Sequence, residues 1–174
     1  MSYERITMSN EFDGPVRETH EERYRIASKY LHGGEVVLDA GCGIGYGEEV
    51  LRKYGRKFTY LGVDKKPIGS GKFCDFESGE GLDIKEFDIF IGFEIIEHLD
   101  GNGVFNFLKI AIKAKKYIIL STPVIPNSNP FHKQHFKPET IPNLMSVALD
   151  WELERTQIQN GTYGIYIFKR KNNE

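Results

Sequence analysis

Short apolar runs alternate along this chain with segments in which apolar residues recur every three or four positions. The runs are typical of strands buried on both faces of a parallel sheet, and the second pattern is typical of helices packed on such a sheet. The apolar runs predict strands at 36–38, 59–63, 72–74, 87–92 and 117–120. The helical spacing predicts helices at 20–31, 48–54, 103–113 and 138–147.

The end of the chain has a different pattern. Segments 151–159 and 163–169 each predict a strand, and Asn160-Gly161 between them is a strong hairpin signal. The last two strands are therefore expected to be antiparallel. Together these patterns predict an α/β fold: a Rossmann-like open sheet, mostly parallel with an antiparallel C-terminal hairpin, and helices on both faces.

The length of 174 residues suits one domain. Residues 1–19 have no clear period and are predicted to form an N-terminal arm, while residues 20–174 form a single domain. The segment 124–136 is predicted to be a long loop. Long loops inside compact domains are usually functional, so this loop, together with the arm 1–19, is expected to gate a small open substrate crevice.

Composition narrows the possible functions. The net charge of −2 differs from that of a strongly basic nucleic-acid-binding protein. Cys42 and Cys74 have no zinc-site spacing and are too few for a disulfide-stapled domain, so a reducing, cytoplasmic environment is expected. No apolar run approaches the roughly 20 residues of a membrane span. The oligomeric state stays open.

Small polar or acidic residues follow most of the predicted strands, namely Asp39, Asp64, Asp75, Glu94 and Ser121. In an open parallel sheet, ligands bind beyond the carboxyl ends of the strands. These side chains are therefore expected to line a binding crevice.

The first strand leads into a turn that contains Gly41, Gly43 and Gly45. Glycines allow a tight turn and a close approach of backbone to ligand. The dinucleotide pattern G-x-G-x-x-G fails, because Tyr46 or Glu48 stands where the third glycine is required. The phosphate-loop ending Gly-Lys-Ser/Thr is also absent. A nicotinamide-dinucleotide oxidoreductase is therefore disfavoured.

An acidic residue followed by G-x-G-x-G resembles the first motif of the class I S-adenosylmethionine-dependent methyltransferases. The resemblance extends from residue 20 to 169 and implies S-adenosylmethionine as the cofactor. It implies a methionine part against the turn, a ribose on Asp64, an adenine beside Asp75 and Phe76, and a sulfonium beside Phe93 and Glu94. The cofactor residues implied by the motifs are Asp39, Ala40, Gly41, Cys42, Gly43, Gly45, Asp64, Asp75, Phe76, Phe93 and Glu94.

Elementary chemistry agrees with these roles. One carboxylate accepts both donors of a ribose diol, and acidic or aromatic neighbours suit a sulfonium cation. The alternative for Asp64 is a turn or helix-capping aspartate. Only ten residues separate Asp64 from Asp75, so the usual helix between the second and third strands is expected to be shortened or lost.

The stretch His20-Glu21-Glu22-Arg23-Tyr24, with Gly45-Tyr46-Gly47, is similar to methyltransferases of cell-surface glycan and small-metabolite biosynthesis. That similarity implies that Arg23, or alternatively Arg17, pairs with the carboxylate of the cofactor. The alternative is a solvated helix face.

On a helix, Glu94, Glu97 and His98 would share one face and offer a divalent-metal site. This E-x-x-E-H stretch resembles metal-dependent methyltransferases that modify the 2′-hydroxyl at the 3′ end of small RNAs, with His135 as their later histidine. Similar stretches also look common in methyltransferases without metal. The aromatic-acidic signature expected after the later histidine is missing, so no metal is expected.

Histidine is the usual base near neutral pH, and an alcohol acceptor gains from a base. His98 is the first candidate, and His132 and His135 in the long loop are the others. The sequence thus predicts a methyltransferase acting on an oxygen or nitrogen of a small molecule or glycan precursor, with no nucleic acid as partner. The alternatives are a metal-dependent RNA 2′-O-methyltransferase and a non-catalytic relative that binds S-adenosylmethionine.

Overall fold

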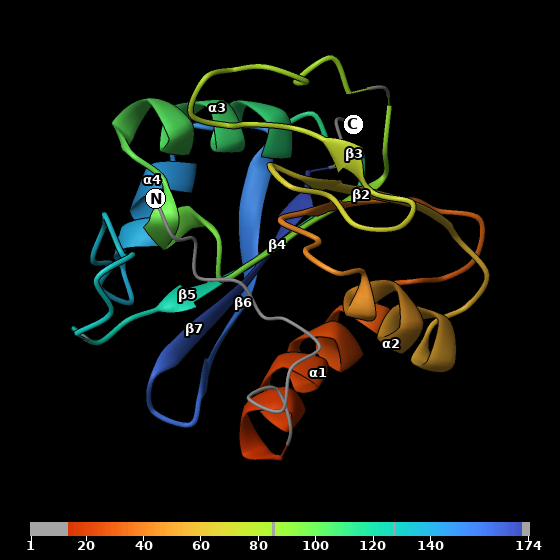
Figure 1. Cartoon of the computed structure of the whole chain (residues 1–174), viewed down its shortest axis with the longest axis horizontal. Helices are drawn as coiled ribbons and strands as arrows, with labels where there is room; N and C mark the ends of the chain where they lie inside the picture. Colours follow the sequence, from red (N-terminus) through yellow and green to blue (C-terminus); the bar gives the residue numbers. More distant parts are fainter. Residues whose placement is uncertain (1–13, 85, 127, 172–174) are drawn as a thin grey trace.

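A seven-stranded sheet forms the centre of the molecule (Figure 1), with the strand order β3-β2-β1-β4-β5-β7-β6. The computed structural model describes residues 14–84, 86–126 and 128–171. Its strands are β1 (Val36–Ala40), β2 (Thr59–Asp64), β3 (Lys72–Phe73), β4 (Ile89–Phe93), β5 (Tyr117–Pro123), β6 (Trp151–Gln159) and β7 (Tyr163–Arg170). The pairs among β1 to β5 are parallel, and β7 is antiparallel to both β5 and β6. The predicted sheet is confirmed.

Helices cover both faces of the sheet, as Figure 1 shows. They are α1 (Pro15–Ser28), α2 (Tyr46–Tyr54), α3 (Gly101–Ala111) and α4 (Thr140–Met145), with a short 3₁₀ helix, η2 (Ile96–His98). Strand alternation sends Val37 to the core under α1 and α2, and Leu38 to the core under α3 and α4. No helix among the described residues is long and apolar enough to cross a membrane.

Several boundaries differ from the sequence predictions. Helix α1 begins at Pro15, where the fixed φ of proline suits a first helical residue, so part of the predicted arm is helical. Residues 1–13 lie outside the described residues. No helix joins β2 to β3, as the short spacing predicted.

The helical arrangement on which the Glu94, Glu97 and His98 metal set depended does not form. Glu94 has φ of 53°, in the left-handed region, and only Ile96–His98 forms a single 3₁₀ turn. The three polar side chains of the E-x-x-E-H stretch therefore do not share one helical face.

Candidate functional site

The amides of the glycine-rich turn are occupied by groups of the protein itself. The N–H groups of Gly41 and Cys42 donate to the carbonyl of Val63 at 2.8 and 3.1 Å, and that of Gly43 donates to Asp64 Oδ2 at 2.9 Å. Two carboxylates stand in the first turn of α2. A phosphate site needs free amides and little negative charge. The turn is therefore not built to hold a pyrophosphate.

Asp39 is buried under this turn, next to the end of β1. The Tyr24 hydroxyl lies 3.2 and 3.1 Å from its two oxygens, and the Tyr60 hydroxyl donates to Oδ2 at 2.6 Å. Burial raises the pKa of Asp39 to about 7, although both tyrosine hydrogen bonds act in the opposite direction. The contacts of Asp39 are internal, and they anchor α1 and β2 beneath the turn.

Asp64 ends β2 directly beside the glycine-rich turn. Its Oδ2 accepts from Gly43 N–H, and its Oδ1 accepts from Lys66 N–H at 2.8 Å. Two backbone donors fix the orientation of this partly exposed carboxylate. Each carboxylate oxygen has a second lone pair, so a fixed Asp64 can accept two further donors, as a ribose diol requires.

Asp75 and Phe76, the residues expected beside the adenine, have other contacts. Asp75 pairs with Lys65 Nζ at 2.9 Å and accepts from Glu77 N–H at 3.0 Å. Burial raises the pKa of Asp75, but the hydrogen bond from Lys65 leads the opposing causes, and the pKa is lowered overall. The Phe76 ring packs edge-to-face on Phe107 in the core, 5.3 Å between centroids. The structure therefore gives both side chains structural contacts.

Arg23 is fully buried on α1 and faces the carboxyl edge of the sheet. Its Nε donates to Gln159 at 3.0 Å, and its guanidinium lies 4.3 Å from the centre of the Tyr163 ring. Its Nη1 lies 3.7 Å from Glu94 Oε1 and 3.3 Å from His20 Nδ1. Burial, and then the charge of Arg23, lower the pKa of His20 to about 3. The Nη2 of Arg23 has no hydrogen-bond partner among the described residues.

Arg17, the alternative for that role, is half exposed and donates to Glu21 at 2.8 Å. The Arg17–Glu21 pair lies on the solvent side of α1, which agrees with the alternative that Arg17 belongs to a solvated helix face.

Two acidic side chains follow β4 and contact the end of β5. Glu94 Oε1 accepts from the Ser121 hydroxyl at 2.7 Å, and Glu97 Oε2 accepts from the Thr122 hydroxyl at 3.1 Å. Glu97 is 1% exposed, and its Oε1 has no partner among the described residues. Burial, and then the Glu94 carboxylate, raise the pKa of Glu97 well above its ordinary value. Before Glu94, Phe93 packs edge-to-face on Tyr24 at 5.0 Å.

The structure brings together two of the three candidate histidines. The rings of His98 and His132 meet edge-to-face, 4.8 Å between centroids. His98 Nδ1 lies 3.2 Å from the Phe131 carbonyl, and His132 Nε2 lies 3.1 Å from Asn129 Nδ2. His135 is exposed and is not part of this pair.

A carboxylate oxygen of Glu97 and one ring nitrogen each of His98 and His132 lie within 4.8 Å of one another. Such a group has the donor types of a divalent-metal site. It differs from the expected set, because Glu94 is absent from it and His132 takes the place of His135. Among the described residues, this group of Glu97, His98 and His132 supports the metal-dependent alternative by its geometry.

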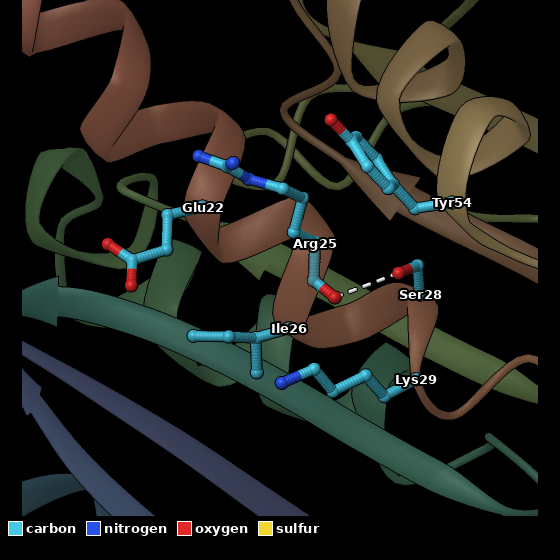
Figure 2. A pocket seen from close by; sticks show the side chains of 6 residues that line it. All are labelled: Glu22, Arg25, Ile26, Ser28, Lys29 and Tyr54. Carbon is cyan, nitrogen blue, oxygen red and sulfur yellow. Dashed lines mark hydrogen bonds between the residues drawn. The ribbon is translucent and has the colours of Figure 1, made fainter.

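A surface concavity of about 450 Å³ lies elsewhere, between α1 and the end of α2 (Figure 2). Figure 2 shows the Arg25 side chain and the Tyr54 ring on opposite walls, with the Ser28 hydroxyl donating to the Arg25 carbonyl at 2.8 Å. None of the predicted site residues lines it. We therefore do not assign the reaction to this concavity.

Sequence reasoning missed the tyrosines that hold Asp39. Tyr24 comes from α1 and Tyr60 from β2, so their meeting depends on tertiary packing. The glycine at position 62 is a signal for the turn itself. Gly62 pairs with Asp39 across the sheet, and a Cβ at Gly62 would lie 2.9 Å from Cys42 Sγ. A missing side chain at that position leaves room for the turn.

No protein-family model matches this sequence, and no curated protein matches it. Solved structures do share the fold. The chain aligns with magnesium protoporphyrin IX methyltransferase from Synechocystis PCC 6803, solved with bound S-adenosylhomocysteine, at TM-score 0.68 and 15% identity over 98% of this chain and 90% of that one.

Two further structures broaden the comparison. 1,6-Didemethyltoxoflavin-N1-methyltransferase from Burkholderia thailandensis, solved with 1,6-didemethyltoxoflavin and S-adenosylhomocysteine, aligns at TM-score 0.64 and 18% identity over 90% of this chain and 81% of that one. The small RNA methyltransferase HEN1 aligns at TM-score 0.67 and 20% identity over 99% of this chain and 27% of that one. The chain therefore has the fold of S-adenosylmethionine-dependent methyltransferases.

Proposed function

We propose that this chain is an S-adenosylmethionine-dependent methyltransferase that acts on an oxygen or nitrogen of a small molecule, glycan precursors included. The observation that carries the proposal is the position of Asp64. It ends β2 beside a glycine-rich turn whose amides are already engaged, and two backbone amides fix its carboxylate. That arrangement suits a ligand that has a ribose diol, which Asp64 can accept, and that has no phosphate group next to the turn. Neighbours of the same fold support it, because two of them hold S-adenosylhomocysteine.

The charged groups beside the turn fit the rest of the cofactor. Arg23 has a buried Nη2 without a partner in the described chain, and a carboxylate is the natural acceptor for such a donor. Glu94 and the aromatic Phe93 suit a positive sulfonium. The cofactor supplies an activated methyl group, and the chain's part is to orient it and the acceptor.

His98 is the proposed base for a hydroxyl acceptor. Its Nδ1 faces the Phe131 carbonyl, and a carbonyl only accepts hydrogen bonds, so the proton lies on Nδ1 and the lone pair on Nε2. Bound S-adenosylmethionine would supply the methyl group to the acceptor oxygen and would leave as a neutral thioether. The hydroxyl proton moves to His98 Nε2, which balances the step.

A metal-dependent RNA 2′-O-methyltransferase is the second candidate. The cluster of Glu97, His98 and His132 favours it, as does the Glu97 Oε1 that has no partner among the described residues. The shared fold of the small RNA methyltransferase also favours it. Against it, Asn129 Oδ1 accepts from Phe131 N–H, which directs Nδ2 toward His132 Nε2. While it accepts from this amide, Nε2 of His132 is not available to a metal, although this bond does not engage Nδ1.

The proposal also places the protein in the cytoplasm. Cys42 and Cys74 are buried free thiols, which suits a reducing compartment.

Calorimetric titration with S-adenosylhomocysteine tests the proposal. The wild type is expected to bind with a Kd of roughly micromolar order, and Asp64→Ala is expected to lose about a hundredfold or more, since it removes the acceptor of two donors. Asp150→Ala is the matched control, because Asp150 is 61% exposed at the start of β6. Equal binding by wild type and Asp64→Ala contradicts the assignment of Asp64.

A further inference from the structure

Glu77 lies at the meeting point of four loops at the carboxyl edge of the sheet. Its Oε1 pairs with Lys133 Nζ in the loop after β5 and faces Asp100 N–H, at 3.4 Å, at the start of α3. Its Oε2 lies 3.5 Å from Lys65 Nζ in the loop after β2, and Lys65 also pairs with Asp75. Lys133 is 56 residues away in sequence.

The turn that carries Glu77 is itself fixed. The amide of Gly79 donates to the Asp75 carbonyl at 2.9 Å, and Asn106 Nδ2 donates to the Phe76 carbonyl at 2.8 Å. The Glu77 side chain is 21% exposed, against 49% for Lys133. The carboxylate is therefore the fixed partner, and the lysine belongs to the loop that it holds.

The loop segment around Lys133 contacts His98 of the histidine pair and the residue before His98. The amides of Lys133 and Gln134 donate to the Glu97 carbonyl at 2.8 and 3.0 Å. Two residues before Lys133, the Phe131 carbonyl faces His98 Nδ1. The position of this carbonyl decides which ring nitrogen of His98 holds the proton.

We infer that Glu77 is a positioning residue for His98, and that it acts through its ion pair with Lys133, which holds the Phe131 carbonyl against the His98 ring. Partly exposed ion pairs contribute little to global stability. Their effect on a surface loop is local, on how often the loop opens. Loss of the ion pair is therefore expected to change the tautomer of His98 and to leave the melting temperature of the protein unchanged. The role of His98 in this inference rests on the proposed function.

The variants are Glu77→Gln, which keeps the shape of the side chain, and Lys133→Met. Lys133→Arg is the conservative rescue, because arginine still pairs with a carboxylate. Glu86→Gln is the matched control: it breaks the 2.5 Å ion pair between Glu86 and Lys115, which precede β4 and β5 at the opposite edge of the sheet.

Long-range ¹⁵N NMR of the histidine rings reads the tautomer of His98 directly in each folded protein, with thermal unfolding as the check of folding. The wild type, Lys133→Arg and Glu86→Gln are expected to show the Nδ1–H form. Glu77→Gln and Lys133→Met are expected to lose it, with amide exchange of residues 131–134 faster by about threefold to tenfold. An unchanged Nδ1–H signal in both variants overturns the inference. The same samples are titrated with S-adenosylhomocysteine; absence of binding in the wild type contradicts the proposed function and leaves the NMR result to decide the role of Glu77.

Discussion

The Tyr24 hydroxyl lies 3.1 Å from Asp39 Oδ2 and 3.2 Å from Oδ1, and this contact joins α1 to β1 under the glycine-rich turn. Tyr60 donates to the same carboxylate from β2. Three elements therefore meet at one buried acid. The packing and charge of this centre therefore determine the position of the turn.

Relative to the wild type, Asp39→Asn is expected to become more stable as the pH rises from about 4 to about 7. Burial raises the pKa of Asp39 from 3.8 to about 7, so in this range the folded state holds a proton that the unfolded state has released. Stability of the wild type then falls with rising pH, on the order of 1.4 kcal/mol per pKa unit, and the variant lacks this loss.

Urea unfolding at several pH values measures the difference between the two proteins. Asp150→Asn, at an exposed position, is the control and should follow the wild type. Parallel profiles for wild type and Asp39→Asn contradict the assigned pKa of Asp39.

Gly47→Ala is expected to destabilise the protein by about 1–3 kcal/mol. A Cβ at Gly47 would lie 2.3 Å from the Tyr24 ring, so the ring must move away from Asp39. Gly101→Ala is the control: Gly101 is also helical, nothing lies within 4 Å of its added Cβ, and a change close to zero is expected. Unfolding of both variants at the same urea concentration would contradict the predicted destabilisation by Gly47→Ala.

The arrangement of the sheet followed from the sequence because its signals are local. Apolar runs mark β1, β2 and β4, and Asn160-Gly161 marks the final hairpin. Asn160 indeed has φ of 52°, which the predicted turn requires. The position of Asp64 at the end of β2 was also predictable, since it directly ends an apolar run; its ribose role stays a prediction.

The acidic stretch after β4 was not predictable in the same way. Its spacing fits a helix, but Glu94 lies at φ 53° and the following Ile95 at φ −123°, so the helix cannot form there. The Ser121 and Thr122 hydroxyls that contact Glu94 and Glu97 come from β5, which no local pattern reveals. Likewise, nothing in the sequence distinguishes His132, beside His98, from the exposed His135.

Arg23→Lys tests the proposed pairing with the carboxylate of the cofactor. The lysine retains a charge but loses the planar donors of arginine, so affinity for S-adenosylhomocysteine is expected to fall about tenfold. Affinity for 5′-methylthioadenosine, which lacks the amino-acid part, is expected to stay within about threefold. Calorimetry measures both, and thermal unfolding checks that the buried substitution leaves the protein folded. Equal losses for the two ligands would place Arg23 away from the carboxylate.

Removal of divalent metal is expected to leave the proposed site intact. After dialysis against a chelator, affinity for S-adenosylhomocysteine should remain within about twofold, and elemental analysis should find no stoichiometric metal. Stoichiometric binding of Mn²⁺ or Zn²⁺ that disappears in His132→Ala, but not in the exposed His135→Ala, would support the metal-dependent candidate instead.

We propose that Asp64 and the glycine-rich turn bind S-adenosylmethionine and not a dinucleotide. Calorimetric titration of the folded wild-type protein with S-adenosylmethionine, S-adenosylhomocysteine and NAD tests it most directly. Saturable binding of both adenosyl compounds is expected, with a Kd of roughly micromolar order, and no heat from NAD. Binding of NAD, or no binding of either adenosyl compound, would contradict the proposal.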